Sequence, residues 1–236
     1  MSRGLFVTGT DTGVGKTHVA AQIAAALLAE GHQVGVYKPV ASGCQSAGDQ
    51  LICHDAESLW QAAGQPGELA RVCPQQFAAP LAPHLAARAE GRTVDAQLLR
   101  SGVEYWRDRS EFVLVEGAGG LMSPISEEDY NADLAEALGY PLLIVAPDAL
   151  GTINQTLQTL ITATTFRQGL PIAGVVLNQV HKDVDDRSVD SNLQELRQRC
   201  VPRVLGRFEW RATDLSEPIG WYALAGNARS DRAHPQ

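Results

Sequence analysis

The stretch FVTGTDTGVGKTHVA, from Phe6 to Ala20, decides the fold. It reads as a short apolar strand, a glycine-bearing turn, a Lys-Thr pair and an alanine-rich helix. Within it, TDTGVGKT (Thr10–Thr17) nearly matches the phosphate-loop pattern G-x-x-x-x-G-K-[S/T]. It departs at the first position, where Thr10 stands for glycine and Gly9 precedes it. The alternative is a chance glycine-rich turn, but the strand before it and the helix after it favour a phosphate-binding loop.

The loop residues are predicted to bind a nucleoside triphosphate. The Lys16 ammonium is expected to bridge the β- and γ-phosphates, and the Thr17 hydroxyl is expected to ligate Mg²⁺. We interpret His18 as a first-turn residue whose backbone N–H helps to bind phosphate, and not as a catalytic base. Four further residues are expected to cradle phosphate oxygens with their backbone N–H groups, aided by the helix N-terminus: Thr12, Gly13, Val14 and Gly15.

Composition limits the classes of function. The chain has 236 residues, a hydrophobic fraction of 44% and a net charge of -8. No cluster of basic residues is present, so a nucleic-acid partner is not expected. The longest apolar stretch is too short and too rich in alanine to span a membrane. The four cysteines show no zinc or disulfide spacing and are expected to be free thiols in the cytoplasm.

Hydrophobic patterning predicts an α/β fold. Near-continuous apolar runs, typical of buried parallel strands, begin at Leu5, Val34, Phe112, Leu142, Ile172 and Arg203. Helical patterns lie between them, at Lys16–Glu30, Asp55–Ala63, Val94–Arg107, Asn131–Leu138, Ile153–Gln168 and Ser188–Arg199. This alternation predicts a P-loop NTPase-like parallel sheet with helices on both faces, in a single domain over residues 1–225. Residues 226–236 are polar and expected to form a mobile tail.

Two long connections and the carboxyl ends of the strands are where ligands are expected. The connections are Ala41–His54 and Arg71–Arg92. The run FVLVEGAGG places Glu116 at the end of a buried strand, in the manner of a Walker B acid. This position favours Mg²⁺ binding over a turn-capping role. Gly117 and Gly119 lie on either side of Ala118, and they let the backbone approach a ligand closely.

For two more charged residues, the sequence by itself leaves two possible roles open. Asp55, in CHDAESL, is either the N-terminal cap of a helix or a metal ligand. Lys38 ends an apolar strand and is followed by Pro39, which fixes the backbone beside it. It is either a solvated strand-end lysine or a second cation that stabilises charge on a transferring phosphoryl group.

Taken together, these residues resemble the dethiobiotin synthetase family of the P-loop NTPase superfamily. The phosphate loop is common to many ATPases, whereas YKPVASG followed by LVEGAGG is far more specific. The matching stretches run in order over most of the chain: Phe6–Thr17, Tyr37–Gly43, Asp55, Phe77–His84, Leu114–Gly120, Leu150–Asn154 and Gly174–Asn178.

The resemblance implies an ATP-dependent cyclo-ligase of biotin biosynthesis. Its substrates would be 7,8-diaminononanoate and CO₂ or bicarbonate, with ATP and Mg²⁺ as cofactors. A carbamate of the diamine would attack the γ-phosphate to give a carbamic–phosphoric anhydride, and the second amine would close the ureido ring. No side-chain nucleophile is needed, so the protein positions its substrates and neutralises charge.

The resemblance also implies residue roles. Lys16 and Lys38 would be catalytic, while Thr17, Asp55 and Glu116 would bind magnesium. It further implies a homodimer with active sites at the interface, where the neighbouring subunit holds the substrate carboxylate. The remaining roles would fall to Ser42 for the diamine, to Gly151, Thr152 and Asn154 for the carboxylate, and to Asn178 and Gln179 for the adenine side.

Two departures from the family pattern stand out. Gly13 replaces a frequent glutamate, and Glu209, in RFEW (Arg207–Trp210), replaces an expected proline in the adenine-side loop. The main rival is a switch ATPase that positions a partner, although such proteins carry a second lysine where this chain has Asp11. A second rival is another amine- or acid-activating ligase on the same fold.

Overall fold

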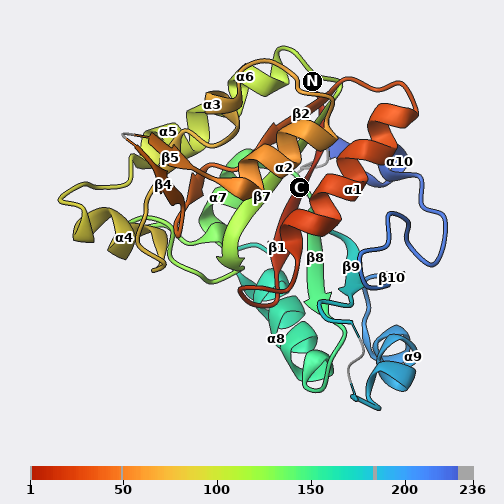
Figure 1. Cartoon of the computed structure of the whole chain (residues 1–236). Helices are drawn as coiled ribbons and strands as arrows, with labels where there is room; N and C mark the ends of the chain where they lie inside the picture. Colours follow the sequence, from red (N-terminus) through yellow and green to blue (C-terminus); the bar gives the residue numbers. More distant parts are fainter. Residues whose placement is uncertain (1, 49, 183–184, 228–236) are drawn as a thin grey trace, which may run out of the picture.

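The centre of the molecule is a parallel sheet with a single antiparallel addition (Figure 1). The computed structural model describes residues 2–48, 50–182 and 185–227. Its main sheet has the order β10-β9-β8-β1-β7-β2, and neighbours along this path are parallel. The predicted parallel sheet is confirmed, with an expected strand in each of the six apolar runs. The parallel strands are β1 (Arg3–Gly9), β2 (Val34–Tyr37), β7 (Phe112–Gly120), β8 (Leu142–Pro147), β9 (Ile172–Asn178) and β10 (Val204–Phe208).

The antiparallel strand is β11 (Gly226–Asn227), which pairs with the start of β1. The sheet therefore includes the first two residues of the segment expected to be a mobile tail. The rest of that segment, residues 228–236, lies outside the described residues.

Helices cover both faces of the sheet (Figure 1). The chain runs from β1 toward the β2 edge and, from β2 onward, toward the β10 edge, so that α1 crosses over one face while α7, α8 and α9 cross over the other. The short α10 packs beside α1, and α2 and α3 lie toward the β2 edge. The helices are α1 (Lys16–Ala29), α2 (His54–Ala62), α3 (Leu69–Val72), α4 (Pro83–Ala89), α5 (Ala96–Ser101), α6 (Glu104–Arg107), α7 (Asn131–Leu138), α8 (Thr152–Thr165), α9 (Val189–Arg199) and α10 (Trp221–Leu224).

The two long connections carry small sheets of their own. A parallel pair joins β3 (Val40–Ala41) to β6 (Gln75–Gln76), and an antiparallel hairpin joins β4 (Gln45–Ala47) to β5 (Gln50–Ile52). The β4–β5 hairpin and α4 extend to one side of the main sheet, beyond β2 (Figure 1). The first connection thus lies outside the main sheet, and α2 follows it.

The predicted helix Val94–Arg107 is wrong as a single element. It forms α5 and α6, separated at Gly102 and Val103. The Tyr37 hydroxyl donates to the carbonyls of Leu98 and Leu99, at 2.8 and 3.1 Å. A Cβ at Gly102 would lie 2.4 Å from that hydroxyl oxygen. The Leu98 carbonyl also accepts the backbone N–H of Gly102 at 3.0 Å, so the Tyr37 hydroxyl shares this acceptor and packs against the turn that separates α5 from α6.

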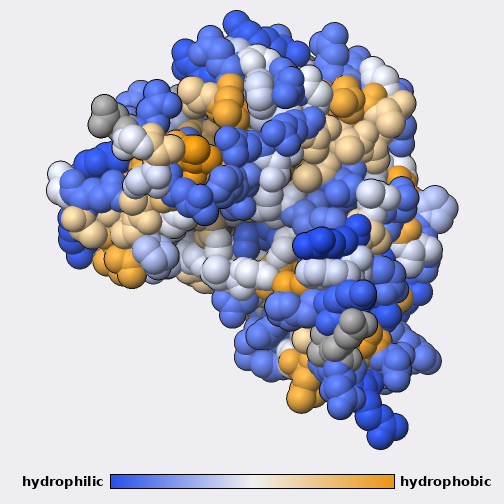
Figure 2. Space-filling view, in the orientation of Figure 1, coloured by the Kyte–Doolittle hydropathy of each residue, from blue (hydrophilic) through white to orange (hydrophobic). Residues whose placement is uncertain are grey.

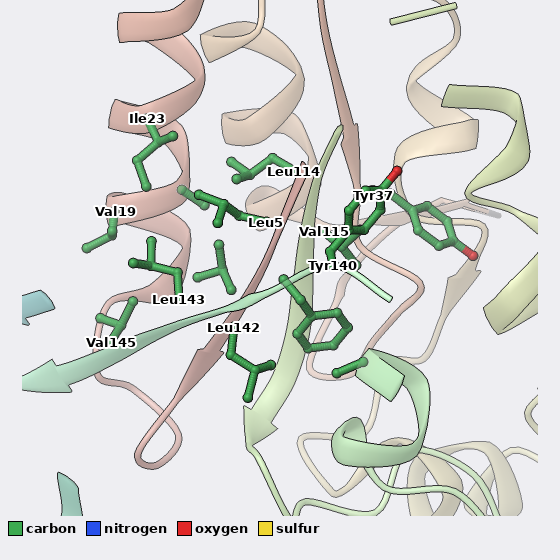
Figure 3. Packing of buried hydrophobic residues seen from close by; sticks show 14 of the residues in the cluster. Leu5, Val19, Ile23, Tyr37, Leu114, Val115, Tyr140, Leu142, Leu143 and Val145 are labelled. Carbon is green, nitrogen blue, oxygen red and sulfur yellow. The ribbon is translucent and has the colours of Figure 1, made fainter. Parts of the chain in front are cut away.

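The core lies on both faces of the central strands (Figure 3). Leu5 and Leu114 pair in register and lie on the same side as Val19 and Ile23 of α1. Tyr140 lies on the opposite side of these strands, and all five residues are fully or almost fully buried. Successive side chains of a strand point to opposite faces of the sheet, so each strand contributes apolar side chains to the core on both faces. On α1, apolar residues four positions apart form the face of the helix that packs on the sheet.

On the face of the molecule drawn in Figure 2, large apolar areas are few. Figure 2 shows a mostly hydrophilic face on which hydrophobic residues gather in separate patches. Within the described part of the chain, no helix has both the length and the apolar character needed to cross a membrane.

Candidate active site

The loop between β1 and α1 has a backbone that favours glycine at two positions. Gly13 has φ 76° and Gly15 has φ 88°, both in the left-handed region. A Cβ at Gly15 would lie 2.0 Å from the side-chain nitrogen of Asn178, so this position also lacks space for a side chain. The sequence pattern and the geometry therefore agree on why glycine stands immediately before Lys16.

Lys16 lies buried inside this loop. Its ammonium donates to the backbone carbonyl of Asp11 at 3.0 Å, and burial lowers its pKa. An ammonium carries three donors, and phosphate oxygens are suitable acceptors for the remaining ones. The phosphate contact predicted for Lys16 is compatible with this position and stays a prediction.

A cluster of four side chains lies beside the loop. The Lys38 ammonium donates to Glu116 Oε1 at 2.5 Å and lies 2.9 Å from Asp55 Oδ2. The Thr17 hydroxyl donates to the same Glu116 oxygen at 2.9 Å. Lys38 follows directly after β2, and Glu116 lies within the adjacent strand β7, one residue past the register pair of Tyr37 with Val115. The expected strand end at Glu116 is wrong, because β7 continues through the glycine-rich run to Gly120. Asp55 comes from the first turn of α2. Three segments far apart in the sequence therefore meet at one point.

The charges in this cluster are unequally buried. The side chains of Lys38 and Glu116 are 5% and 1% exposed, whereas that of Asp55 is 51% exposed. Burial lowers the pKa of the Lys38 ammonium, but the carboxylates of Glu116 and Asp55 outweigh it and hold the pKa above its ordinary value. Lys38 is therefore a fixed cation, and the solvated alternative for this lysine does not apply.

The donor set fits Mg²⁺. Glu116 Oε2 is buried without a hydrogen-bond partner, and the Thr17 hydroxyl and Asp55 carboxylate add hard oxygen atoms. Among the described residues, no group of three or more His, Cys, Asp and Glu side chains could hold a metal by itself. A magnesium ion here would therefore need oxygen ligands from the nucleotide phosphates as well, as in other P-loop sites.

These residues surround one cavity of about 370 Å³. It is large enough for a small-molecule ligand. Most of the predicted site residues from the first half of the chain share it. Its lining consists of Thr12, Gly13, Gly15, Lys16, Thr17, Lys38, Ala41, Ser42, Asp55, Glu116, Gly117, Ala118 and Gly119.

The predicted adenine-side residues lie outside this lining. Asn178 donates to the backbone carbonyl of Val14 at 3.0 Å, and its own Oδ1 is buried without a partner. Gln179 Oε1 accepts the backbone N–H of Trp210 at 3.2 Å. His18 lies 3.0 Å from the carbonyl of Ala212, a contact that fits a positioning role better than a catalytic one.

The predicted carboxylate-binding residues also lie apart from the cavity. Gly151 is the N-terminal cap of α8, with φ 96°, and Thr152 begins that helix. Asn154 lines a second cavity of about 610 Å³, together with Asp11 and Met122. The two groups of predicted ligands are therefore not gathered into one cavity of a single chain.

Sequence reasoning missed Asn131, which shapes the glycine-rich end of β7. Its Oδ1 accepts the N–H of Ala118 at 3.2 Å, and its Nδ2 donates to the carbonyls of Ala118 and Gly120 at 2.6 and 2.8 Å. The side chain is fully buried. The available signal was an asparagine at the start of a helix, which is ordinary there, so the sequence did not distinguish it.

Comparison with known proteins places this site in a family. A family model described as AAA domain matches residues 3–218. The dethiobiotin synthetase BioD of Rhodopirellula baltica is 44% identical over 84% of this chain and 81% of the relative. That of Anaeromyxobacter dehalogenans (strain 2CP-C) is 46% identical over 88% and 90%, and that of Bacillus subtilis 37% over 86% and 86%. The chain belongs to the ATP-dependent dethiobiotin synthetase family.

Solved structures of similar shape agree on the fold alone. A ParA family ATPase from Chlorobium tepidum aligns with a TM-score of 0.52 and 12% identity, over 87% of this chain and 83% of that chain. FtsY from Thermotoga maritima aligns with a TM-score of 0.51 and 15% identity, over 95% and 67%. Both likenesses support a P-loop NTPase fold.

The loop predicted to lie on the adenine side begins at a buried ion pair. Arg207 Nε lies 2.6 Å from the fully buried Asp148 Oδ2, and Asn192 donates to the other oxygen of Asp148 at 2.9 Å. Glu209, which stands where the family pattern suggests proline, is 61% exposed and lies 3.8 Å from Arg207. A buried ion pair therefore holds the start of this loop.

Proposed function

We propose that the chain closes the ureido ring of dethiobiotin from 7,8-diaminononanoate and CO₂, with ATP as the phosphoryl donor. One observation carries the proposal. A buried lysine, Lys38, lies between two carboxylates at the wall of a phosphate-loop cavity. Family membership supplies the substrate class, and the site supplies charge where a phosphoryl group would be transferred.

The reaction is a sequence of substrate steps. An amine of the diamine takes up CO₂ and loses a proton, giving a carbamate. A carbamate oxygen attacks the γ-phosphorus and ADP leaves, giving a mixed anhydride. The second amine attacks the carbonyl carbon, phosphate leaves, and the ring closes with loss of a proton. Each nucleophile belongs to the substrate, so the protein acts by positioning and by charge stabilisation.

The two buried lysines are assigned to stabilise negative charge on different oxygen atoms. Lys16, inside the loop, is assigned to the β- and γ-phosphates. Lys38, which lies 2.9 Å from Asp55 and shares the cavity lining with Ser42, is assigned to the oxygen shared between carbamate and γ-phosphate. Ser42 is assigned to the diamine. A cation fixed in a site with little water lowers the energy of a developing anion without reorganisation.

Magnesium would be held by Thr17, Asp55 and Glu116. When bound, the ion supplies a divalent charge that neutralises phosphate oxygens during transfer. Lys38 would also neutralise the negative charge of the Asp55 and Glu116 carboxylates when no metal ion is bound. The unpartnered Glu116 Oε2 supports this assignment.

We further propose that the enzyme is a homodimer acting in the cytoplasm. Gly151, Thr152 and Asn154 would bind the substrate carboxylate of the neighbouring subunit through the N-terminus of α8. Their separation from the phosphate-loop cavity supports a site completed by a second chain. Leu150, beside them, is 84% exposed, which suits a residue covered by a partner.

The test is phosphate release from Mg-ATP with and without the diamine and bicarbonate, with dethiobiotin followed by mass. We expect release to require both co-substrates and to match the product in amount. Slow release that ignores the diamine would overturn the proposal and favour a switch ATPase. Release that needs a different amine or acid would point to another ligase on this fold.

A further inference from the structure

Three cysteines gather beside the candidate active site with no role in the proposed reaction. Cys44, Cys53 and Cys73 are all buried and all free. The thiol of Cys53 interacts with the thiols of both Cys44 and Cys73. They come from three separate segments: the start of the β4–β5 hairpin, the cap of α2 and the end of α3.

The register of the hairpin sets Cys44 opposite Cys53. In the β4–β5 ladder, Gln45 pairs with Ile52 and Ser46 with Leu51. The next pair outward, at the open end of the hairpin, is Cys44 with Cys53. The two thiols are therefore cross-strand neighbours, and their mutual interaction agrees with this register.

The backbone hydrogen bonds define the type of pair. The N–H of Cys44 donates to the carbonyl of Phe77 at 3.0 Å, and the carbonyl of Cys53 accepts from Glu57 at 3.1 Å. Both groups point away from the facing cysteine, as in a non-hydrogen-bonded pair. Cα atoms in such pairs are about 4.5 Å apart, inside the range of about 4.4–6.8 Å that a disulfide spans.

Cys73 is a less suitable partner. It is 1% exposed, whereas Cys44 and Cys53 are 7% and 6% exposed and border the exposed strand β4. Its thiol donates to the backbone carbonyl of Gln75 at 3.5 Å. A small oxidant therefore meets the Cys44–Cys53 pair before it meets Cys73.

We propose that Cys44 and Cys53 form an oxidation site, which hydrogen peroxide converts reversibly to a disulfide and thereby lowers turnover. One sulfur attacks the peroxide, the O–O bond breaks, and a sulfenic acid and water form. The second sulfur then attacks the first, the S–O bond breaks, and a second water leaves with the remaining thiol hydrogen. Two thiols and one peroxide thus give one disulfide and two waters.

The expected effect on turnover follows from the sequence neighbours of the pair. Ser42 lies two residues before Cys44, Asp55 lies two residues after Cys53, and both line the cavity. Joining the sulfurs restrains these two segments, so that Ser42 and Asp55 can no longer adjust to the substrate independently. This part of the inference rests on the proposed function, whereas formation of the disulfide does not.

The test treats the full-length protein with hydrogen peroxide, then maps disulfides by mass spectrometry without reduction. We expect a Cys44–Cys53 linkage that dithiothreitol removes. We expect dethiobiotin formation to fall about tenfold and to recover on reduction, since a misplacement of ~1 Å in an active site can cost about a hundredfold.

Single substitutions of the cysteines test which thiols form the disulfide. Cys44→Ser should abolish the linkage and the sensitivity to peroxide. Cys53→Ser should do the same and stay folded, because serine is a favoured helix cap. Cys73→Ser should keep both the linkage and the sensitivity to peroxide. Cys200→Ser, at the end of α9, should keep both as well. Absence of the linkage in the folded protein would overturn the oxidation site, and a linkage with unchanged turnover would overturn the effect on activity.

Discussion

Lys38 is the side chain on which the proposed chemistry depends most. We predict that Lys38→Gln lowers the rate of dethiobiotin formation by about 10²–10³-fold, the usual effect of removing one charge-stabilising group. The amide can still donate to Glu116, so the fold should persist and ATP affinity should change little. Steady-state product formation and equilibrium ATP binding measure the two effects separately.

The chain offers a matched control at Lys182, an exposed lysine outside the described site. Lys182→Gln should leave both turnover and ATP affinity unchanged. If Lys38→Gln turned over at a near-normal rate, Lys38 would have no part in the mechanism. If it lost ATP binding as strongly as turnover, Lys38 would be a nucleotide-binding residue and not one that acts on the transferring group.

The start of α7 and the end of β7 act as one unit through Asn131. We predict that Asn131→Asp destabilises the protein by about 2 kcal/mol, because a carboxylate cannot donate to the carbonyls of Ala118 and Gly120. The Ala118–Gly119 backbone lines the cavity, so the Michaelis constant for ATP should rise as well. Thermal unfolding and ATP titration of turnover test these effects. Loss of stability without a change in ATP dependence would limit Asn131 to folding.

A second link joins α5 to the loop before α7 and depends on pH. The pKa of Asp129 is lowered, chiefly by its hydrogen bond from Arg100, with Ser126 adding to it. A carboxyl whose folded pKa is depressed adds stability above its unfolded pKa of about 3.9, and this contribution is lost as the pH falls through the folded pKa. We predict that Asp129→Asn costs about 1–2 kcal/mol at pH ~7, and that this difference shrinks below pH ~4.

The control for Asp129 lies two residues earlier in the same loop. Glu127 pairs with Arg88, but both side chains are exposed, at 52% and 63%. Exposed ion pairs add little to stability, so Glu127→Gln should unfold in urea like the parent chain at both pH values. A pH-independent loss in Asp129→Asn would mean that shape at this position, and not charge, stabilises the loop.

Over the whole molecule, the sequence predicted what local pattern determines. Apolar runs gave the six parallel strands, and the glycine–lysine spacing gave the phosphate loop. The sequence placed Lys38 and Glu116 near one edge of the sheet, but it ended the strand at Glu116, whereas β7 continues to Gly120. Their direct contact and the orphaned Glu116 Oε2 needed coordinates, since they depend on side-chain packing.

Features made by distant segments were not predictable from local pattern. The two-residue strands β3 and β6 exist because Val40 and Ala41 pair with Gln75 and Gln76, which no local propensity signals. The Tyr37 hydroxyl, which contacts the end of α5 where the helix breaks, comes from more than sixty positions earlier in the chain. Asn131 was missed for the same reason, because its backbone partners belong to another element.

The assembly of two chains is the remaining prediction. We expect a homodimer in the absence of nucleotide, with the outer face of α8 in the interface. Ile161 on this helix is 62% exposed, and a charge placed there would be buried without a partner in the dimer. Ile161→Glu should therefore shift the protein to monomers and reduce turnover, whereas Val201→Glu, at a 99% exposed site after α9, should stay dimeric and active. Sedimentation velocity measures both variants. A parent chain that dimerises only with ATP would support the switch ATPase, and a dimeric Ile161→Glu would place the interface away from this part of α8.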